Sequence, residues 1–216
     1  MSEFWDNMFQ KIGTVWSFEP VDSAVYSCNL FSENGLQKIL IPGVGFGRNA
    51  KPFVEKGMKV TGIEISETAI RLARELGLKI PIHHGSVAEM PFDDLVYDGI
   101  YCYALIHLLN KNERRQLLKN CYNQLREGGI MVFVVVSKGY AKLYENGKPI
   151  SNDRFRMQNG LEVFFYDSES VKKEFEPFDL AEFCEIEEPV KHMPNEEPMR
   201  FWMVICRKAS LNQTDH

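Results

Sequence analysis

Ile39-Leu40-Ile41-Pro42-Gly43-Val44-Gly45-Phe46-Gly47 is the stretch that decides how we expect this chain to fold. A short apolar run, typical of a buried strand, leads into three closely spaced glycines, and a helical pattern follows over 48–56. This arrangement brings backbone N–H groups and the N-terminus of a helix close to a bound ligand. Glycine is required where a Cβ would collide with the ligand or block the turn. Tight turns without a ligand use the same pattern, so the glycines alone leave a binding role open.

The same rhythm of strand and helix continues through the middle of the chain. Ser66 is placed to cap the next helix, and Gly77 is placed to stop it. Regular alternation of this kind implies a parallel sheet with right-handed crossovers, and therefore an α/β, Rossmann-like, doubly wound fold with helices on both faces. We expect strands over 38–42, 59–64, 79–83, 97–103 and 130–136, and helices over 48–56, 66–76 and 112–126.

The regions before and after this part of the chain do not show the regular alternation of strands and helices. Residues 137–160 are polar, rich in Gly, Asn and Lys and too long for a plain connector, so we expect a lid or substrate loop there. Residues 1–35 are expected to form a helical leader that carries several aromatic side chains. The whole chain, 1–216, is interpreted as a single domain. The remaining expected elements are a strand over 162–166, a helix over 168–175 and closing strands over 180–186 and 201–206.

Composition restricts the classes of function. The net charge of −5 weighs against a nucleic-acid substrate, because such binding depends on phosphate neutralisation by a basic surface. The basic cluster Lys111, Arg114, Arg115 and Lys119 is interpreted as the solvated side of a helix. No apolar run approaches the roughly 20 residues that span a bilayer, and the N-terminus does not resemble a signal peptide, so we expect a cytoplasmic protein. Five cysteines without a C-x-x-C pair predict neither a disulfide framework nor a metal site.

A second signal lies at the end of the second expected strand. Glu64 follows the first glycine by about 20 residues, where an acidic side chain can accept hydrogen bonds from ribose hydroxyls. The glycine turn and this acid together predict a nucleoside cofactor. In the dinucleotide pattern G-x-G-x-x-G the third glycine would fall on Arg48, which argues against a nicotinamide cofactor. Two further segments, Gly85–Phe92 and Leu125-Arg126-Glu127-Gly128-Gly129, stand after the third expected strand and before the fifth.

With these segments the chain resembles the class I S-adenosylmethionine-dependent methyltransferases over about 38–136. The resemblance implies about seven strands with an antiparallel last strand, S-adenosylmethionine as cofactor and S-adenosylhomocysteine as product. Two positions depart from the family pattern, because Ile41 and Ser86 stand where acidic residues are frequent. A weaker similarity points to the thiopurine, halide and tellurite-resistance branch. The implied cofactor-binding residues are Gly43, Val44, Gly45, Gly47, Glu64, Ile65, Ser86, Val87 and Tyr103.

The acceptor side is less defined by the sequence. Methyl transfer is an in-line displacement, and it needs a general base only if the acceptor must lose a proton. Tyr103 and His107 follow the fourth expected strand and are the catalytic candidates, with His107 as a base or as a packing residue. The adjacent pair His83-His84 is interpreted as structural, since neighbours on a strand point to opposite faces. Substrate candidates are Trp5 and Trp16 in the leader, Tyr140, and Arg154 and Arg156, one on each side of an extended segment.

Several alternatives stay open at this point. A non-catalytic cofactor-binding domain is supported by Ile41 and Ser86, whereas an NAD(P)-dependent oxidoreductase is disfavoured by Arg48. Among acceptors, charge favours a small molecule over nucleic acid, and a protein acceptor is not ruled out by the sequence. Neither the acceptor atom nor the oligomeric state follows from the residues.

Overall fold

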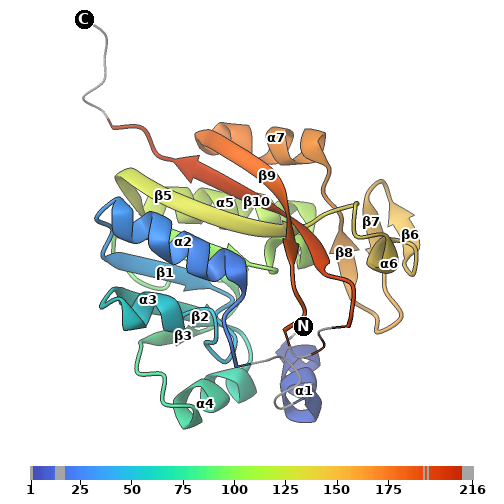
Figure 1. Cartoon of the computed structure of the whole chain (residues 1–216), viewed down its shortest axis with the longest axis horizontal. Helices are drawn as coiled ribbons and strands as arrows, with labels where there is room; N and C mark the ends of the chain where they lie inside the picture. The colour runs from blue at the N-terminus through green and yellow to red at the C-terminus, as the bar shows by residue number, and fades with distance from the viewer. Residues whose placement is uncertain (1, 13–17, 192, 194, 211–216) are drawn as a thin grey trace, which may run out of the picture.

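A seven-stranded sheet forms the centre of the computed structural model, which describes residues 2–12, 18–191, 193 and 195–210 (Figure 1). Its strand order is β3-β2-β1-β4-β5-β10-β9. Neighbours from β3 to β5 pair in parallel, and β10 pairs antiparallel with both β5 and β9. The Rossmann-like prediction and its antiparallel last strand are confirmed. The strands are β1 (Lys38–Pro42), β2 (Lys59–Glu64), β3 (Ile82–His84), β4 (Tyr97–Tyr103), β5 (Leu125–Val136), β9 (Leu180–Glu188) and β10 (Met199–Arg207).

Burial on both faces explains why the central strands are continuous apolar runs. Ile39 and Ile41 face the layer of α2 (Asp22–Glu33) and α3 (Lys51–Glu55), whereas Leu40 between them faces the layer of α5 (Lys111–Gln124) and α7 (Ser168–Phe175). All side chains from Ile130 to Val136 in β5 are buried. Helix α4 (Glu67–Glu75) lies beside β2 and β3, with the Ser66 hydroxyl accepting from Ala69 N as predicted.

Some predicted boundaries differ from the structure. Strand β3 begins at Ile82 rather than Lys79, because Pro81 has no N–H for the ladder and restricts the residue before it. The turn expected before the fifth strand lies inside β5 as an irregularity. Leu125 pairs with Tyr97 and Ile130 pairs with Gly99, so the residues between them loop out of register.

The basic cluster on α5 is only partly solvated, so one expectation was wrong. Arg114 is buried, donates from Nε to Glu174 at 2.8 Å and lies 4.0 Å from the centre of the Phe164 ring. Lys111, Arg115 and Lys119 are exposed, as expected. A buried arginine needs such a partner, and that partner is distant in sequence.

Residues 137–160 are not a plain loop, which corrects the sequence interpretation. They contain α6 (Ala141–Tyr144), β6 (Lys148–Ser151) and β7 (Arg154–Arg156), and these two strands join β8 (Glu162–Phe164) in a separate antiparallel sheet. The Tyr144 ring packs 4.6 Å from Phe155 and 5.2 Å from Phe165, centre to centre. Lys138 bridges Asp153 at 2.7 Å and Asp167 at 2.5 Å, which fastens the small sheet to the start of α7.

The leader is helical, as predicted, with α1 (Ser2–Ile12) and α2 separated by residues 13–21. Among the described residues, none of the helices combines the length and apolar composition needed to cross a bilayer. All five cysteines are free, and only Cys184 is exposed. The described part of the chain holds no cluster of three or more metal-ligating His, Cys, Asp or Glu side chains.

Candidate cofactor and acceptor site

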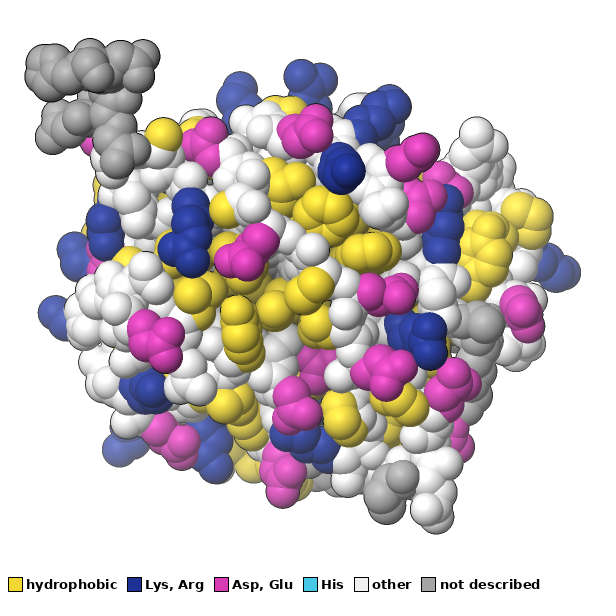
Figure 2. Space-filling model, turned by 45° about the horizontal axis from the view of Figure 1, so that its top comes forward, with side chains coloured by type: hydrophobic (Ala, Val, Ile, Leu, Met, Phe, Trp, Pro, Cys, Tyr) yellow, Lys and Arg dark blue, Asp and Glu magenta, His cyan; other side chains and the backbone are white. Residues whose placement is uncertain are grey.

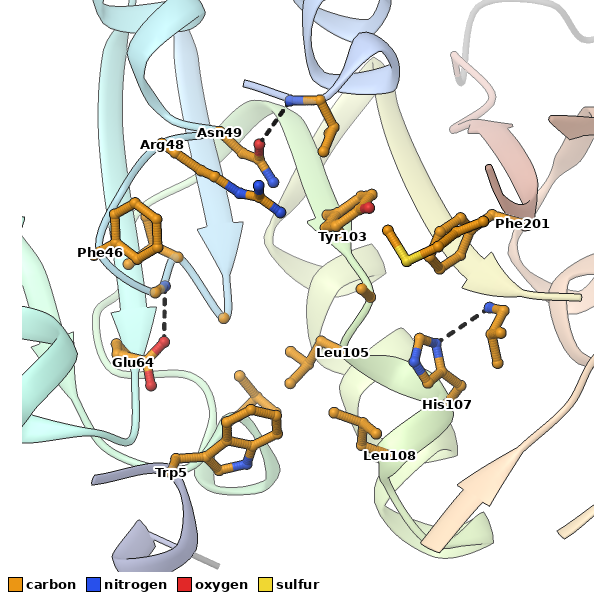
Figure 3. Close-up of a pocket in the computed structure, with 18 of the residues that line it drawn as sticks. Trp5, Phe46, Arg48, Asn49, Glu64, Tyr103, Leu105, His107, Leu108 and Phe201 are labelled. Carbon is orange, nitrogen blue, oxygen red and sulfur yellow. Dashed lines mark hydrogen bonds between the residues drawn. The ribbon is translucent and has the colours of Figure 1, made fainter. Parts of the chain in front are cut away.

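A cavity of about 360 Å³ opens at the carboxyl ends of β1, β2 and β4 (Figure 3). The strand order reverses direction between β1 and β4, and ligands of open α/β sheets bind at such a switch point. The volume falls within the roughly 300–1,000 Å³ of small-molecule sites. Residues of the leader, of the ends of β1 to β5, of the segment between β9 and β10 and of the start of β10 line the cavity.

The glycine turn after β1 forms one wall. Gly43, Gly45 and Gly47 have φ angles of 69°, 57° and 88°, a region that L side chains rarely adopt. A Cβ on Gly43 would lie 2.9 Å from Leu105 Cδ2, so this glycine also permits a close approach of the two strand ends. A Cβ on Gly47 would lie 2.2 Å from Leu78 Cδ2. Gly43, Val44 and Gly45 line the cavity as expected, whereas Gly47 does not and instead permits packing against Leu78.

Glu64 lies at the end of β2 with its carboxylate at the cavity wall (Figure 3). Gly45 N donates to Oε2 at 2.8 Å, and Ser66 N donates to Oε1 at 2.9 Å. Burial raises the pKa of this carboxyl, while these backbone hydrogen bonds act in the opposite direction. Each carboxylate oxygen has a second lone pair, so Glu64 can still accept a hydroxyl from a ligand. The neighbouring Ile65 lines the same wall.

The segments after β3 and β4 form a third wall of the cavity. Ser86 and Val87 line the cavity, and the Ser86 hydroxyl accepts from Ala88 N at 3.3 Å, so its hydrogen stays available to a ligand. After Tyr103 the chain turns sharply at Ala104, which has a φ of 52° and donates its N–H to Val134 O at 2.9 Å. This turn directs Leu105 and His107 towards the cavity.

The Tyr103 hydroxyl is buried and has no hydrogen-bond partner among the residues that the structure describes. Its ring packs 5.5 Å from the Phe201 ring, centre to centre, and the hydroxyl points towards Phe201 (Figure 3). Burial raises the pKa of this phenol, so the group is uncharged. An unsatisfied hydroxyl at a cavity wall marks a place where a ligand can supply the missing partner.

His107 is buried, and one of its ring nitrogens is already engaged. Val136 N donates to His107 Nδ1 at 3.2 Å, and burial lowers the pKa of the imidazole to about 3. The ring is therefore neutral, and its hydrogen is on Nε2 because Nδ1 is the acceptor. Nε2 faces the cavity (Figure 3). In this geometry the nitrogen that faces the cavity is a donor, which favours a packing or positioning role of His107 over that of a general base.

The expected substrate residues divide into two groups. Trp5 and Tyr140 line the cavity, but Arg154 and Arg156 do not. Alternate residues of a strand share one face, and both arginines donate to Glu162, at 3.1 Å and 2.8 Å. The expectation of free charges on opposite sides was therefore wrong. Trp16 lies outside the described residues. The cavity residues that the sequence did not identify include Leu108, Leu143, Val190, Met199 and Phe201.

Helix α1 of the leader docks beside the Glu64 wall. Asp6 Oδ1 accepts from Ser66 Oγ at 2.6 Å and from Thr68 N at 3.0 Å, so α1 caps the start of α4. Phe9 is buried against the Phe46 ring of the glycine turn, with ring centres 6.4 Å apart. The leader therefore packs against the glycine turn and α4, and its Trp5 and Phe9 line the cavity.

In sequence and in fold, this chain is similar to known methyltransferases. A family model described as "Methyltransferase domain" matches residues 39–129. An uncharacterized methyltransferase of Oceanobacillus iheyensis is 31% identical over 101 residues, which cover 47% of this chain and 47% of that protein. Over these residues the chain is similar to methyltransferases, and a solved S-adenosylmethionine-dependent methyltransferase of Clostridium acetobutylicum shares its fold, with a TM-score of 0.67 and 16% identity over 87% of this chain and 91% of that one.

Two further proteins are similar to this chain in fold or in sequence. A Burkholderia thailandensis 1,6-didemethyltoxoflavin-N1-methyltransferase has the same fold, with a TM-score of 0.69 and 15% identity over 94% of this chain and 85% of that one. Its structure holds 1,6-didemethyltoxoflavin and S-adenosylhomocysteine. A Drosophila melanogaster tRNA N(3)-methylcytidine methyltransferase is 24% identical over 60% of this chain and 44% of that protein. The match spans less than half the length of each of the two curated relatives.

Proposed function

We propose that this chain binds S-adenosylmethionine in the cavity and transfers its methyl group to a small-molecule acceptor. The observation that carries the proposal is the buried Glu64 carboxylate beside a glycine turn, at the switch point of a Rossmann-like sheet. Sheets of this kind bind nucleosides at this position, and the carboxylate retains lone pairs for ribose hydroxyls.

The residues around Glu64 fit the rest of the cofactor. Ser86, Val87 and Leu105 offer one hydroxyl and two apolar side chains for the adenine. Gly43 and Gly45 carry no side chain to obstruct the amino-acid part, and the half-buried Arg48 supplies a positive charge for its carboxylate. When bound, S-adenosylmethionine supplies an electrophilic methyl group on a sulfonium sulfur. The chain's own task is to align an acceptor with that methyl group in a site shielded from water.

Several features favour a small molecule over RNA. The net charge is −5, and Figure 2 shows acidic and basic side chains interspersed on the face it presents, without a continuous basic surface. RNA binding draws much of its affinity from such a surface. The acceptor side of the cavity is enclosed by apolar groups, including Leu108, Met199 and Phe201. The Burkholderia relative by fold binds a small heterocycle, which supports the same choice here.

We further propose that residues 1–216 act as one domain in the cytoplasm. Trp5 of the leader, Tyr140 before the small sheet and Phe201 of β10 all line the same cavity, which supports a single functional unit. The five free cysteines suit a reducing compartment.

Thermal unfolding tests the cofactor, with S-adenosylmethionine, S-adenosylhomocysteine and NADH in parallel. A ligand at 100 times its dissociation constant stabilises the folded state by about 2.7 kcal/mol, or roughly 5–10 °C for a domain of this size. We expect the shift with the two sulfur nucleosides and not with NADH. Glu64→Ala should reduce it, while Glu67→Ala, an exposed acid three residues later, should not.

Turnover then separates an enzyme from a cofactor sensor. An active enzyme releases S-adenosylhomocysteine when a suitable acceptor is supplied, whereas a sensor binds the cofactor and releases none across an acceptor panel. A shift with NADH alone would contradict the proposed cofactor.

A further inference from the structure

The cavity continues beyond the expected nucleoside site into a chamber with almost entirely apolar walls. We call this region the acceptor chamber. Its walls come from the ends of β4 and β5, from α6 and from the start of β10, so distant parts of the chain enclose it. An apolar enclosure with few polar groups is the usual design of a site for a small organic ligand. The chamber side chains are Leu108, Leu109, Val136, Tyr140, Leu143, Val190, Met199 and Phe201.

Besides the Tyr140 side chain, His107 and Tyr103 bring two uncharged polar groups to these walls. The Nε2–H group of His107 faces the chamber, because the other ring nitrogen, Nδ1, accepts a hydrogen bond from Val136 N. The Tyr103 hydroxyl lies buried, and none of the residues that the structure describes forms a hydrogen bond with it. His107 can only donate in this state, so a ligand that enters the chamber must offer it an accepting atom or leave the N–H unsatisfied.

The described walls of the acceptor chamber offer a cationic ligand no counter-charge. Lys191 bridges Asp22 at 2.8 Å and donates to Pro20 O at 2.7 Å, so its charge is already compensated. Arg48 adds a guanidinium on the glycine-turn side. The carboxylates among the described lining residues are Glu64, at the nucleoside end, and Glu19, in the leader before α2. The chamber walls themselves carry no carboxylate among the described residues.

We propose that the methyl acceptor is an apolar molecule of aromatic size, not cationic, that presents a hydrogen-bond-accepting atom to His107 Nε2–H. His107 is then a specificity-determining residue that positions the acceptor rather than a base. This inference rests on the function proposed above. In the transfer, a lone pair of the acceptor forms the bond to the methyl carbon while the carbon–sulfur bond breaks and its electron pair returns to sulfur. No proton passes to His107 in this step.

The test uses the full chain saturated with S-adenosylhomocysteine and three bicyclic probes of similar shape. Isoquinoline has an accepting nitrogen, naphthalene has none, and 2-methylisoquinolinium is a cation without the lone pair. Dissociation constants come from ligand-observed NMR titrations. One added hydrogen bond to a neutral group should make isoquinoline bind about 3- to 10-fold more tightly than naphthalene. We expect 2-methylisoquinolinium to bind more weakly than both.

Two variants assign this preference to His107. His107→Phe keeps a ring of similar size and removes the donor, so isoquinoline and naphthalene should bind equally. Because Val136 N would lose its partner in that variant, His107→Met serves as the second variant, with a thioether sulfur that can accept weakly from Val136 N and that carries no donor. The exposed His84, outside the cavity lining, gives the matched control His84→Phe, which should keep the wild-type preference.

The outcomes separate this inference from the proposed function. Failure of S-adenosylhomocysteine to bind the wild-type chain would overturn the proposed function and this inference with it. Cofactor binding without a preference for isoquinoline, or with a preference for the cation, would overturn the inference alone. Binding of tRNA to the loaded chain in place of isoquinoline would do the same and would point to a macromolecular acceptor. Loss of the preference in both His107 variants supports it.

Discussion

Removing one oxygen atom from the wall of the cavity should make this protein more stable. The Tyr103 hydroxyl is buried and has no partner among the described residues, so the folded state carries the cost of its desolvation. That cost is about 1–3 kcal/mol for a buried unsatisfied group, and Tyr103→Phe removes it while keeping the ring against Phe201. At roughly 2–4 °C per kcal/mol for a domain of this length, the melting temperature should rise by about 2–12 °C.

Tyr101 provides a matched control on the same strand. It lies two residues earlier on β4, shares the face of Tyr103, and its hydroxyl is 3.1 Å from Ser23 Oγ. Tyr101→Phe removes the same atom but breaks a buried hydrogen bond, so it should lower the free energy of unfolding by about 0.5–1.5 kcal/mol. Identical chemical changes two residues apart should therefore have opposite signs.

Urea titration of the three proteins at neutral pH without ligand measures both effects, because a change in midpoint at constant slope reports stability. A loss of stability in Tyr103→Phe as large as that in Tyr101→Phe would refute the reasoning, since it would mean that the Tyr103 hydroxyl is satisfied in the folded chain. A gain would identify it as a group kept for ligand binding at the expense of stability.

Three further predictions concern the walls of the site. Glu64→Gln leaves one oxygen for the two backbone N–H groups and should weaken S-adenosylhomocysteine binding by about 1–3 kcal/mol in calorimetry. Asp6→Ala should release α1 from α4, which altered Trp5 fluorescence would report, and should weaken cofactor binding. Gln10→Ala, on the exposed face of α1, should change neither the fluorescence nor the binding. The pKa of His107 is about 3 when folded and near 6.5 when unfolded, so this group destabilises the fold as pH falls below about 6.5, by at most about 1.4 kcal/mol per unit. His107→Asn should lose less stability than wild type between pH 7 and 5, and equal losses would contradict a buried neutral imidazole.

The sheet could be predicted from the sequence because its signals are local. The strand at 97–103 was predicted to the residue, and Ser66 caps α4 as expected. Within the small sheet, β8 lies in the strand expected over 162–166, whereas β6 and β7 were missed. Strand β6 is exposed along its whole length, so it lacks the alternation that marks a half-buried strand. Arg114 was misjudged because its partner Glu174 is distant in sequence. Both errors arise where tertiary contacts outweigh a local pattern.

The two halves of the candidate site also differ in whether a local sequence pattern or tertiary contacts determine them. Most of the nucleoside half comes from residues 43–87, where each strand end is followed at once by the side chain or glycine that lines the cavity, so a pattern read along the chain identifies it. The acceptor chamber is enclosed by strand ends far apart in the sequence, and the chemical state of His107 depends on the backbone N–H of Val136 on the neighbouring strand. Whether that imidazole is a base or a donor is therefore decided by strand pairing rather than by residue type. Family resemblance consequently predicts the cofactor, while the acceptor has to be inferred from the assembled chamber.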